Sequence, residues 1–180
     1  MVCADVDESF EPALEPGPIA AELAERKACA ISGLVPQDAR WVLTGDTLVV
    51  LDGLAGRLPR YLGKPATPEQ ARVMLCSLSG TTHRVVTGVA ALRLDDGKLV
   101  SSSETTLVSM RAITPAELDA YVDSGEWRGK AGGYAIQETA DRFVEKLAGG
   151  GFDNVVGLPV DLALNLLEGL GWVDPGAARG

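Results

Sequence analysis

The sequence predicts a single α/β domain in which an antiparallel ribbon of strands is combined with helices. Three features favour this class: two helix starts built on a Thr-Pro pair, two strand-like runs joined by Asp95-Asp96-Gly97, and a Val- and Leu-rich run over residues 41–51. A chain of 180 residues holds one well-cored domain, and a second independent core is not expected.

The N-terminal part predicts a helix, a strand and a loop in that order. Pro18 suits the first turn of a helix, and apolar residues then recur at helical spacing, so we predict a helix over residues 18–30. Residues 41–51 are typical of a strand that ends at an Asp-Gly turn. Residues 53–60 contain two Gly and one Pro and are predicted to form a loop.

The two Thr-Pro pairs mark the beginnings of two further helices. Thr67 and Thr114 are suitable N-caps, Pro follows at the first helical position, and Gln or Glu stands at the capping-box position. Gly80 and Gly125 can end these helices.

The remaining elements follow from alternation and turn residues. Residues 82–94 and 98–110 are strand-like and predict a hairpin. Residues 143–147 predict another short strand, and a leucine-rich helix is expected between residues 157 and 170. Residues 174–180 are expected to form a mobile tail.

Charge and hydropathy argue against nucleic acid and membrane partners. The net charge is −9, and no Lys/Arg cluster with interleaved aromatic residues counters it, so a polyphosphate backbone would be repelled. A small phosphate ligand needs only a few local cations and stays possible. The longest apolar stretch, residues 42–51, is interrupted by Gly45 and Asp46 and is far shorter than the roughly 20 residues of a membrane helix.

The cysteines and the N-terminus indicate a cytoplasmic protein. Cys3, Cys29 and Cys76 are odd in number and widely spaced, and no histidine lies at ligand spacing from them. Neither a disulfide framework nor a zinc site is therefore expected. The N-terminal residues are acidic and lack the basic and then apolar pattern of a signal peptide.

Asp46 is the residue whose position most needs an explanation. It interrupts an apolar strand, where an unpaired carboxylate costs several kcal/mol, so it should reach a cleft or be matched by a cation. Asp46 is then a candidate metal ligand or general base, and the alternative is an Asp that caps a turn. Glu8 could add a second carboxylate of the kind Mg²⁺ prefers, although a solvated acidic run is the alternative for it.

Two lysines and a glutamine are candidate ligand contacts. Lys27 and Lys64 could neutralise phosphate oxygens, and Lys64 has the better claim because Gly63 and Pro65 fix its backbone. Gln137 follows a glycine-containing segment and offers both a donor and an acceptor to a base edge. His83 is the single histidine, and we interpret it as a hydrogen-bonded structural residue.

Taken together, five motifs in order along the chain resemble the Maf family of nucleoside triphosphate pyrophosphatases. Each motif is weak alone, but their order and spacing match the family over residues 5–170. They are Thr44-Gly45-Asp46-Thr47, Leu62-Gly63-Lys64-Pro65, Leu78-Ser79-Gly80 with His83, Val85 and Thr87, the segment Lys130 to Gln137, and Asn154-Val155-Val156-Gly157-Leu158-Pro159.

This resemblance implies an α/β fold with a mixed, elongated central sheet flanked by helices and two lobes around a cleft. The implied reaction is hydrolysis of a nucleoside triphosphate to the monophosphate and pyrophosphate with Mg²⁺ or Mn²⁺. Asp46 matches the catalytic acid and proton acceptor, and Glu8 matches the last acid of an Asp-x-Asp-Glu segment. Lys27 and Lys64 match phosphate-site lysines.

The resemblance also bears on the substrate and on assembly. The Ala-Gly-x-Tyr-x-Ile-Gln form is similar to the branch that prefers dTTP and UTP, and Thr47 and Gln137 match positions linked to substrate choice. A homodimer is a family-level expectation.

Two departures from the family leave an alternative open. The family's N-terminal strand and Ser-x-Ser-Pro-Arg-Arg loop are not found, so residues 1–173 are expected to be an N-terminally truncated domain, and Glu138 stands where Gly is usual. The alternative is a non-catalytic nucleotide-binding or regulatory protein that has lost this phosphate-binding loop.

Overall fold

The computed structural model describes residues 6–11, 15–53 and 58–173. Five strands, five α-helices and two short 3-10 helices follow one another along these residues. In chain order they are α1 (Pro16–Ile31), β1 (Trp41–Leu51), β2 (Arg60–Leu62), α2 (Pro68–Leu78), β3 (Thr82–Arg93), β4 (Leu99–Met110), α3 (Pro115–Ser124), η1 (Ala131–Gly133), η2 (Thr139–Phe143), β5 (Val144–Ala148), α4 (Phe152–Val156) and α5 (Val160–Gly169).

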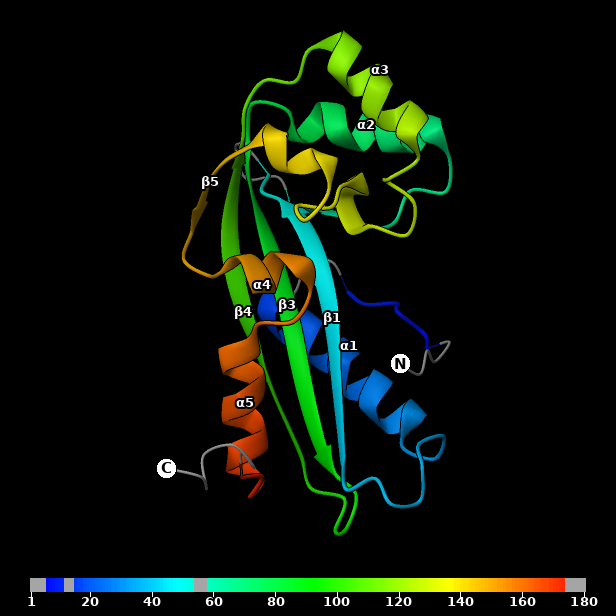
Figure 1. The fold of residues 1–180 in the computed structure, drawn as a ribbon, viewed down its shortest axis with the longest axis vertical. Helices are drawn as coiled ribbons and strands as arrows, with labels where there is room; N and C mark the ends of the chain where they lie inside the picture. Colours follow the sequence, from blue (N-terminus) through cyan, green and yellow to red (C-terminus); the bar gives the residue numbers. More distant parts are fainter. Residues whose placement is uncertain (1–5, 12–14, 54–57, 174–180) are drawn as a thin grey trace.

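The strands form one sheet in the order β2-β1-β3-β4-β5. Strands β1, β3 and β4 are long and make an elongated sheet that runs most of the length of the molecule (Figure 1). Where a mixed sheet was expected, each of the four pairings between described strands is antiparallel. The short connection after residue 93 makes β3 and β4 a hairpin, as the sequence predicted.

The helices divide the molecule into two lobes (Figure 1). At one end α2 and α3 pack together with η1 and η2, and their core includes Leu75, Leu78, Tyr121 and Phe143. At the other end α1 lies on one face of the sheet, while α4 and α5 lie on the opposite face. The long strands join the two lobes, so the expected two-lobed α/β architecture is confirmed.

Helix α1 approaches the sheet unusually closely because small residues meet there. Its buried face includes Ala20, Ala24 and Ala28. Gly88 of β3 lies beneath it, and a Cβ atom added to Gly88 would stand 2.0 Å from the carbonyl oxygen of Ala20. Only glycine leaves room for the helix backbone at this point, and the close approach brings the side chains of α1 within reach of the next strand, β1.

The helices with capping residues, α2 and α3, begin where the sequence predicts them. The side chain of Thr67 accepts a hydrogen bond from the backbone N–H of Gln70, and Thr114 and Glu117 form a complete capping box. Gly125 ends α3 in the left-handed conformation. Helix α1 begins two residues before the predicted start, because Pro16 rather than Pro18 occupies its first position.

Four short elements, β2, η1, η2 and α4, were not predicted from the sequence. Strand β2 begins at Arg60, the last residue of the predicted loop, and α4 precedes the leucine-rich helix. Residues 54–57 of that loop and the predicted tail from residue 174 lie outside the described residues.

Two of the three cysteines lie in the part of the chain that the structure describes. Cys29 and Cys76 are exposed free thiols, and Cys3 lies outside the described residues. No described helix is long and apolar enough to cross a membrane.

Candidate functional site

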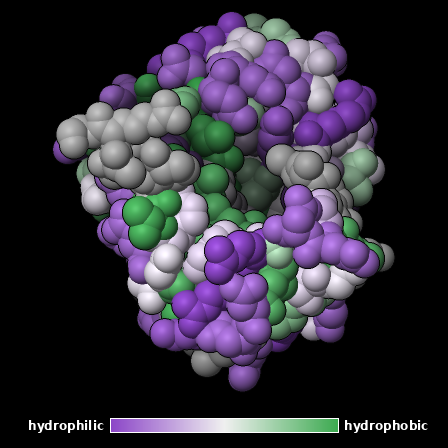
Figure 2. All heavy atoms as spheres, turned by 60° about the horizontal axis from the view of Figure 1, so that its bottom comes forward, coloured by the Kyte–Doolittle hydropathy of each residue, from purple (hydrophilic) through white to green (hydrophobic). Residues whose placement is uncertain are grey.

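A cavity of about 770 Å³ opens between the two lobes. Its walls come from α1, the middle of β1, and the segments around residues 61–64, 129–137 and 155–157. Figure 2 shows the molecule hollowed in this way, with apolar side chains inside and hydrophilic ones around much of the rim. A cavity of this size accommodates a ligand as large as a nucleotide.

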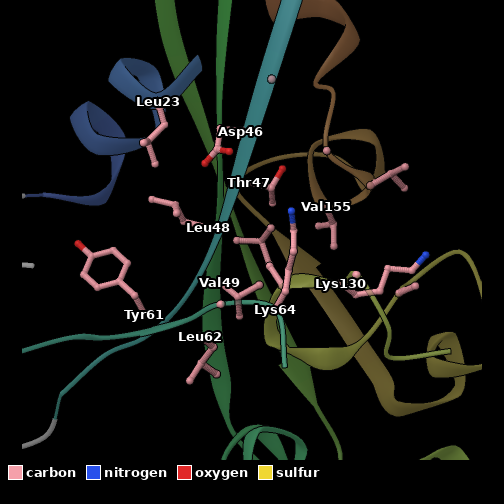
Figure 3. Close-up of a pocket in the computed structure, with 18 of the residues that line it drawn as sticks. Leu23, Asp46, Thr47, Leu48, Val49, Tyr61, Leu62, Lys64, Lys130 and Val155 are labelled. Atoms are coloured by element: carbon pink, nitrogen blue, oxygen red, sulfur yellow. The ribbon is translucent and has the colours of Figure 1, made fainter. Parts of the chain in front are cut away.

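The cavity lies against a stretch of β1 that, within the described part of the chain, has a sheet neighbour on one side only. Strand β2 pairs with β1 only at Val49, Val50 and Leu51, whereas β3 pairs with nearly all of β1. Successive side chains of a strand point to opposite faces, so Asp46 and Thr47 leave this edge in opposite directions (Figure 3). The cavity therefore reaches both faces of the sheet at one place.

On the α1 face, two carboxylates share one ammonium group. The Nζ atom of Lys27 forms ion pairs with the carboxylates of Asp46 and Glu8, the latter at 2.8 Å. The side chain of Asp46 is 10% exposed and that of Glu8 52% exposed. The cation that the position of Asp46 required is thus Lys27, from a helix on the neighbouring face.

The pKa values reflect this shared contact. Burial lowers the pKa of Lys27, but its hydrogen bonds to Asp46 and Glu8 outweigh burial and raise the pKa above its ordinary value. The hydrogen bond from Lys27 also lowers the pKa of Glu8, with a smaller contribution from the charge of Lys64. Lys27 is therefore an ammonium ion, and Glu8 a carboxylate, at neutral pH.

The segment around Glu8 is held against the cavity by contacts on both sides of it. The Nη1 atom of Arg26 donates to the carbonyl oxygens of Asp7 and Ser9, at 3.2 and 2.9 Å. The rings of Phe10 and Tyr61 meet edge to face with their centroids 4.8 Å apart, and both residues line the cavity. These contacts place Glu8 beside Lys27 although it lies far from Asp46 in sequence.

On the opposite face, Thr47 belongs to a buried hydrogen-bond chain. Its Oγ1 atom lies 3.0 Å from the Oγ1 atom of Thr87, which donates to the backbone carbonyl of Asn154 at 2.8 Å. Thr87 and Asn154 are both fully buried. Thr47 is thereby tied to α4 across the sheet.

Lys64 and Gln137 line the same cavity from the other lobe. The ammonium group of Lys64 extends toward the position of Thr47 (Figure 3). The backbone N–H of Gly132 donates to the carbonyl of Gly63 at 3.0 Å, which joins the segment bearing Lys64 to η1. Lys130 also lines the cavity and pairs with Glu138 at 3.3 Å.

His83 lies outside this cavity, as expected of a structural residue. It is fully buried, and its Nε2 atom is 2.8 Å from the hydroxyl of Tyr134. Burial lowers its pKa to about 4, so the ring is neutral at physiological pH.

The structure brings all the site residues named from the sequence to one cavity. Lys27 contacts both Glu8 and Asp46 directly. The same cavity is also lined by Thr47, Lys64 and Gln137. Sequence reasoning did not find the Phe10–Tyr61 pair or the link from Thr47 through Thr87 to Asn154. The available signals were the position of Tyr61 beside the Leu62-Gly63-Lys64-Pro65 motif and the presence of Thr87 and Asn154 in two other motifs.

Among the residues that the structure describes, two carboxylates, those of Glu8 and Asp46, meet at this site. No group of three or more His, Cys, Asp or Glu side chains that could hold a metal ion occurs among the described residues. Two carboxylates nevertheless fit Mg²⁺, which is commonly held by one or two of them together with substrate phosphates and water.

Comparison with known proteins finds one matching family model and a set of similar relatives. The family model described as "Maf-like protein" matches residues 1–170. The chain is 46% identical over 167 residues to the "dTTP/UTP pyrophosphatase" of Maricaulis maris (strain MCS10), an alignment that covers 93% of this chain and 75% of the relative.

Relatives from two other organisms are also similar. The chain is 40% identical over 168 residues to the protein of the same name from Hyphomonas neptunium (strain ATCC 15444), with 93% of this chain and 82% of the relative covered. Identity to the protein of the same name from Pyrococcus abyssi (strain GE5 / Orsay) is 38% over 164 residues, with 91% and 81% covered.

Proposed function

This chain belongs to the Maf-like protein family, and from that premise we propose that it is a nucleoside triphosphate pyrophosphatase acting on dTTP and UTP. The products are the nucleoside monophosphate and pyrophosphate. The relatives named dTTP/UTP pyrophosphatase support this reaction and this substrate class. The observation that carries the proposal is the Glu8–Lys27–Asp46 cluster at a cavity that Lys64 enters from the opposite lobe.

Asp46 is assigned as the general base. Its carboxylate is mostly buried at the cavity wall and accepts a hydrogen bond from Lys27, which holds it in one position. A carboxylate in this position can take a proton from the water that attacks a phosphorus atom of the substrate. Lys27 supplies positive charge to the same region and offsets part of the cost of burying the carboxylate.

Lys64 is assigned to the triphosphate. Its ammonium group enters the cavity from the lobe opposite α1, where it can contact phosphate oxygens and stabilise the negative charge that develops as the anhydride bond breaks. Thr47 and Gln137 are assigned to the nucleoside, in keeping with the substrate-choice positions that they match.

A divalent cation completes the proposed site. Glu8 and Asp46 would hold Mg²⁺ or Mn²⁺ through carboxylate oxygens, and the cation would neutralise phosphate charge when bound. The partly exposed position of Glu8 leaves one carboxylate accessible from the cavity.

The reaction is tested by measuring pyrophosphate release from dTTP, UTP, and a panel of other triphosphates with Mg²⁺ or Mn²⁺ and with chelator. We expect turnover of dTTP and UTP that chelator abolishes. Replacing Asp46 by Asn keeps the shape but removes the base, and should lower kcat by about 10²–10⁴-fold.

The matched control is Asp95→Asn at the turn between β3 and β4. Asp95 is exposed and pairs with Arg40 at 3.0 Å, away from the cavity. This variant should keep the wild-type rate. Equal rates for the wild type and Asp46→Asn would refute the role of Asp46, and nucleotide binding without any turnover would refute the enzymatic function.

A further inference from the structure

We propose that Thr87 is a positioning residue that fixes the hydroxyl of Thr47 as a hydrogen-bond acceptor toward the cavity. The site would then select a nucleotide that presents a hydrogen-bond donor at this point. This inference rests on the proposed function, since it specifies what one wall of that site recognises.

The direction of the two hydrogen bonds follows from the number of protons that each threonine hydroxyl carries. A threonine hydroxyl has one proton and two lone pairs. The Oγ1 atom of Thr87 lies 2.8 Å from the backbone carbonyl oxygen of Asn154. A carbonyl oxygen can only accept, so Thr87 donates its proton to this bond. In the 3.0 Å contact between the two hydroxyl groups, Thr87 must then be the acceptor, and Thr47 donates its own proton to Thr87. Toward the cavity Thr47 has only lone pairs left.

The end of this chain is held rigidly in place. Asn154 is fully buried, and its Nδ2 atom donates to the carbonyl of Val85 at 3.1 Å and to Oγ1 of Thr106 at 2.8 Å. Thr106 in turn donates to the carbonyl of Gly151 at 3.2 Å. The carbonyl of Asn154 also accepts from the backbone N–H of Gly157 at 3.1 Å. Without the proton of Thr87, two acceptor oxygens would face each other at 2.8 Å, so Thr87 keeps this bond.

The acceptor character of Thr47 limits which part of a nucleotide it can contact. Ionised phosphate oxygens are acceptors and gain nothing from a second acceptor. The donors of a nucleotide are the N–H groups of its base and the hydroxyl groups of its sugar. Thymine and uracil carry a proton on N3, whereas cytosine has a lone pair there, so an acceptor facing N3 would favour UTP over CTP.

Lys64 is compatible with this assignment. Figure 3 shows its ammonium group extending toward Thr47, and an ammonium group is itself a donor. Because a hydroxyl oxygen has two lone pairs, a contact with Lys64 would leave one for the nucleotide.

The test compares kcat/KM for UTP with that for two analogues that present an acceptor without a proton. CTP has a bare N3, and 3′-O-methyl-UTP has an ether oxygen in place of the 3′-hydroxyl. Thr87→Val removes the acceptor to which Thr47 donates, so the hydroxyl of Thr47 becomes free to donate into the cavity. We expect the preference for UTP over one analogue to fall about tenfold. The analogue that gains identifies base or sugar as the partner.

Three further variants separate positioning from general destabilisation. Thr87→Ser keeps the hydroxyl and should keep the wild-type preference. Thr87→Ala removes the same hydroxyl in a smaller side chain and should reproduce Thr87→Val if the latter folds poorly. In a Thr47→Val background, Thr87→Val should cause no further change. Because each preference is a ratio within one preparation, partial loss of folded protein cancels.

Unchanged preferences for both analogues in Thr87→Val and Thr87→Ala, with UTP still hydrolysed, would overturn this inference alone. The same change in the Thr47→Val background as in the wild type would also overturn it, because the effect would then not pass through Thr47. Absence of turnover by the wild type would overturn the proposed function, and this inference with it.

Discussion

At the scale of single residues, the central feature is one ammonium group shared by two carboxylates. Lys27 contacts Asp46 and Glu8 together, and these contacts raise the pKa of Lys27 and lower that of Glu8. Without Lys27, two negative charges would share one wall of the cavity. Lys27 therefore affects both the position and the charge balance of the proposed catalytic group.

Replacing Lys27 by Met should lower pyrophosphate release with dTTP about 10- to 100-fold. The change keeps a long side chain of similar reach but removes the charge that holds Asp46 and offsets phosphate charge. Steady-state kinetics at neutral pH measures the effect.

Lys98→Met is the matched control for this prediction. Lys98 is exposed at the turn between β3 and β4, away from the cavity, and its loss should leave the rate unchanged. A wild-type rate in Lys27→Met would contradict the assigned role.

Individual residues differed in how far the sequence could predict them. Asp46 was detectable because a charged group in an apolar strand needs a partner, which is a local argument. That the partner is Lys27 depends on how closely α1 packs on the sheet. The chain from Thr47 to Asn154 joins residues far apart in sequence, and no local pattern indicates it.

At the scale of elements, the helices with capping signals were predicted nearly to the residue. Caps are local interactions between neighbouring residues, so the sequence carries them directly. Strand β2 and helix α4 are short, and short elements are stabilised mainly by what they pack against. Strand β2 exists because β1 offers a free edge at residues 49–51.

The packing of α1 on the sheet depends on the absence of a side chain at Gly88. Gly88→Ala would place a methyl group within 2.1 Å of two backbone atoms of Ala20, so α1 would have to move outward. We expect the free energy of unfolding to fall by about 1–3 kcal/mol. Activity should fall as well, because Lys27 would move away from Asp46. Urea unfolding and pyrophosphate release measure the two effects.

Gly33→Ala serves as the control for this substitution. A Cβ atom added to Gly33 meets nothing within 4 Å, so the same chemical change should alter neither property appreciably. Loss of stability without loss of activity in Gly88→Ala would show that the close approach does not set the contact between Lys27 and Asp46.

At the scale of the whole molecule, the long strands join the two lobes, and β3 begins inside the lobe that holds α2 and α3 (Figure 1). His83 at the start of β3 pairs with Tyr134, a cavity-lining residue that follows η1. Among the described residues the Nδ1 atom of His83 has no hydrogen-bond partner, and burial lowers the pKa of the ring to about 4. At neutral pH this contact within the lobe is therefore made by a neutral histidine.

This arrangement predicts that stability falls with acidification. The unfolded chain takes up a proton on His83 near pH 6.5, whereas the folded protein does so only near pH 4. The contribution of the neutral histidine is thus fully present above pH 6.5 and is lost as the pH falls toward 4. Between pH 7.5 and 5 the loss is about 2 kcal/mol of unfolding free energy.

His83→Gln isolates this effect, because the chain contains a single histidine. Urea unfolding of the wild type and His83→Gln at pH 7.5 and pH 5 gives the comparison. The wild type should lose about 2 kcal/mol more than the variant over this range. An equal loss in both would show that His83 does not carry the pH dependence.

The sequence by itself determined the class of fold, the capped helices and the long hairpin, and it indicated the charged residues that line the cavity. These features depend on interactions between residues close in sequence and on polar groups within apolar runs. Both can be recognised in the sequence alone. Tertiary structure decided which of those residues meet. The close packing of α1 at Gly88 brings Lys27 to Asp46. The edge of β1 that β2 leaves uncovered among the described residues lets one cavity reach Asp46 and Thr47 on opposite faces. Such contacts join residues distant in sequence, so they depend on the packed arrangement of the whole chain.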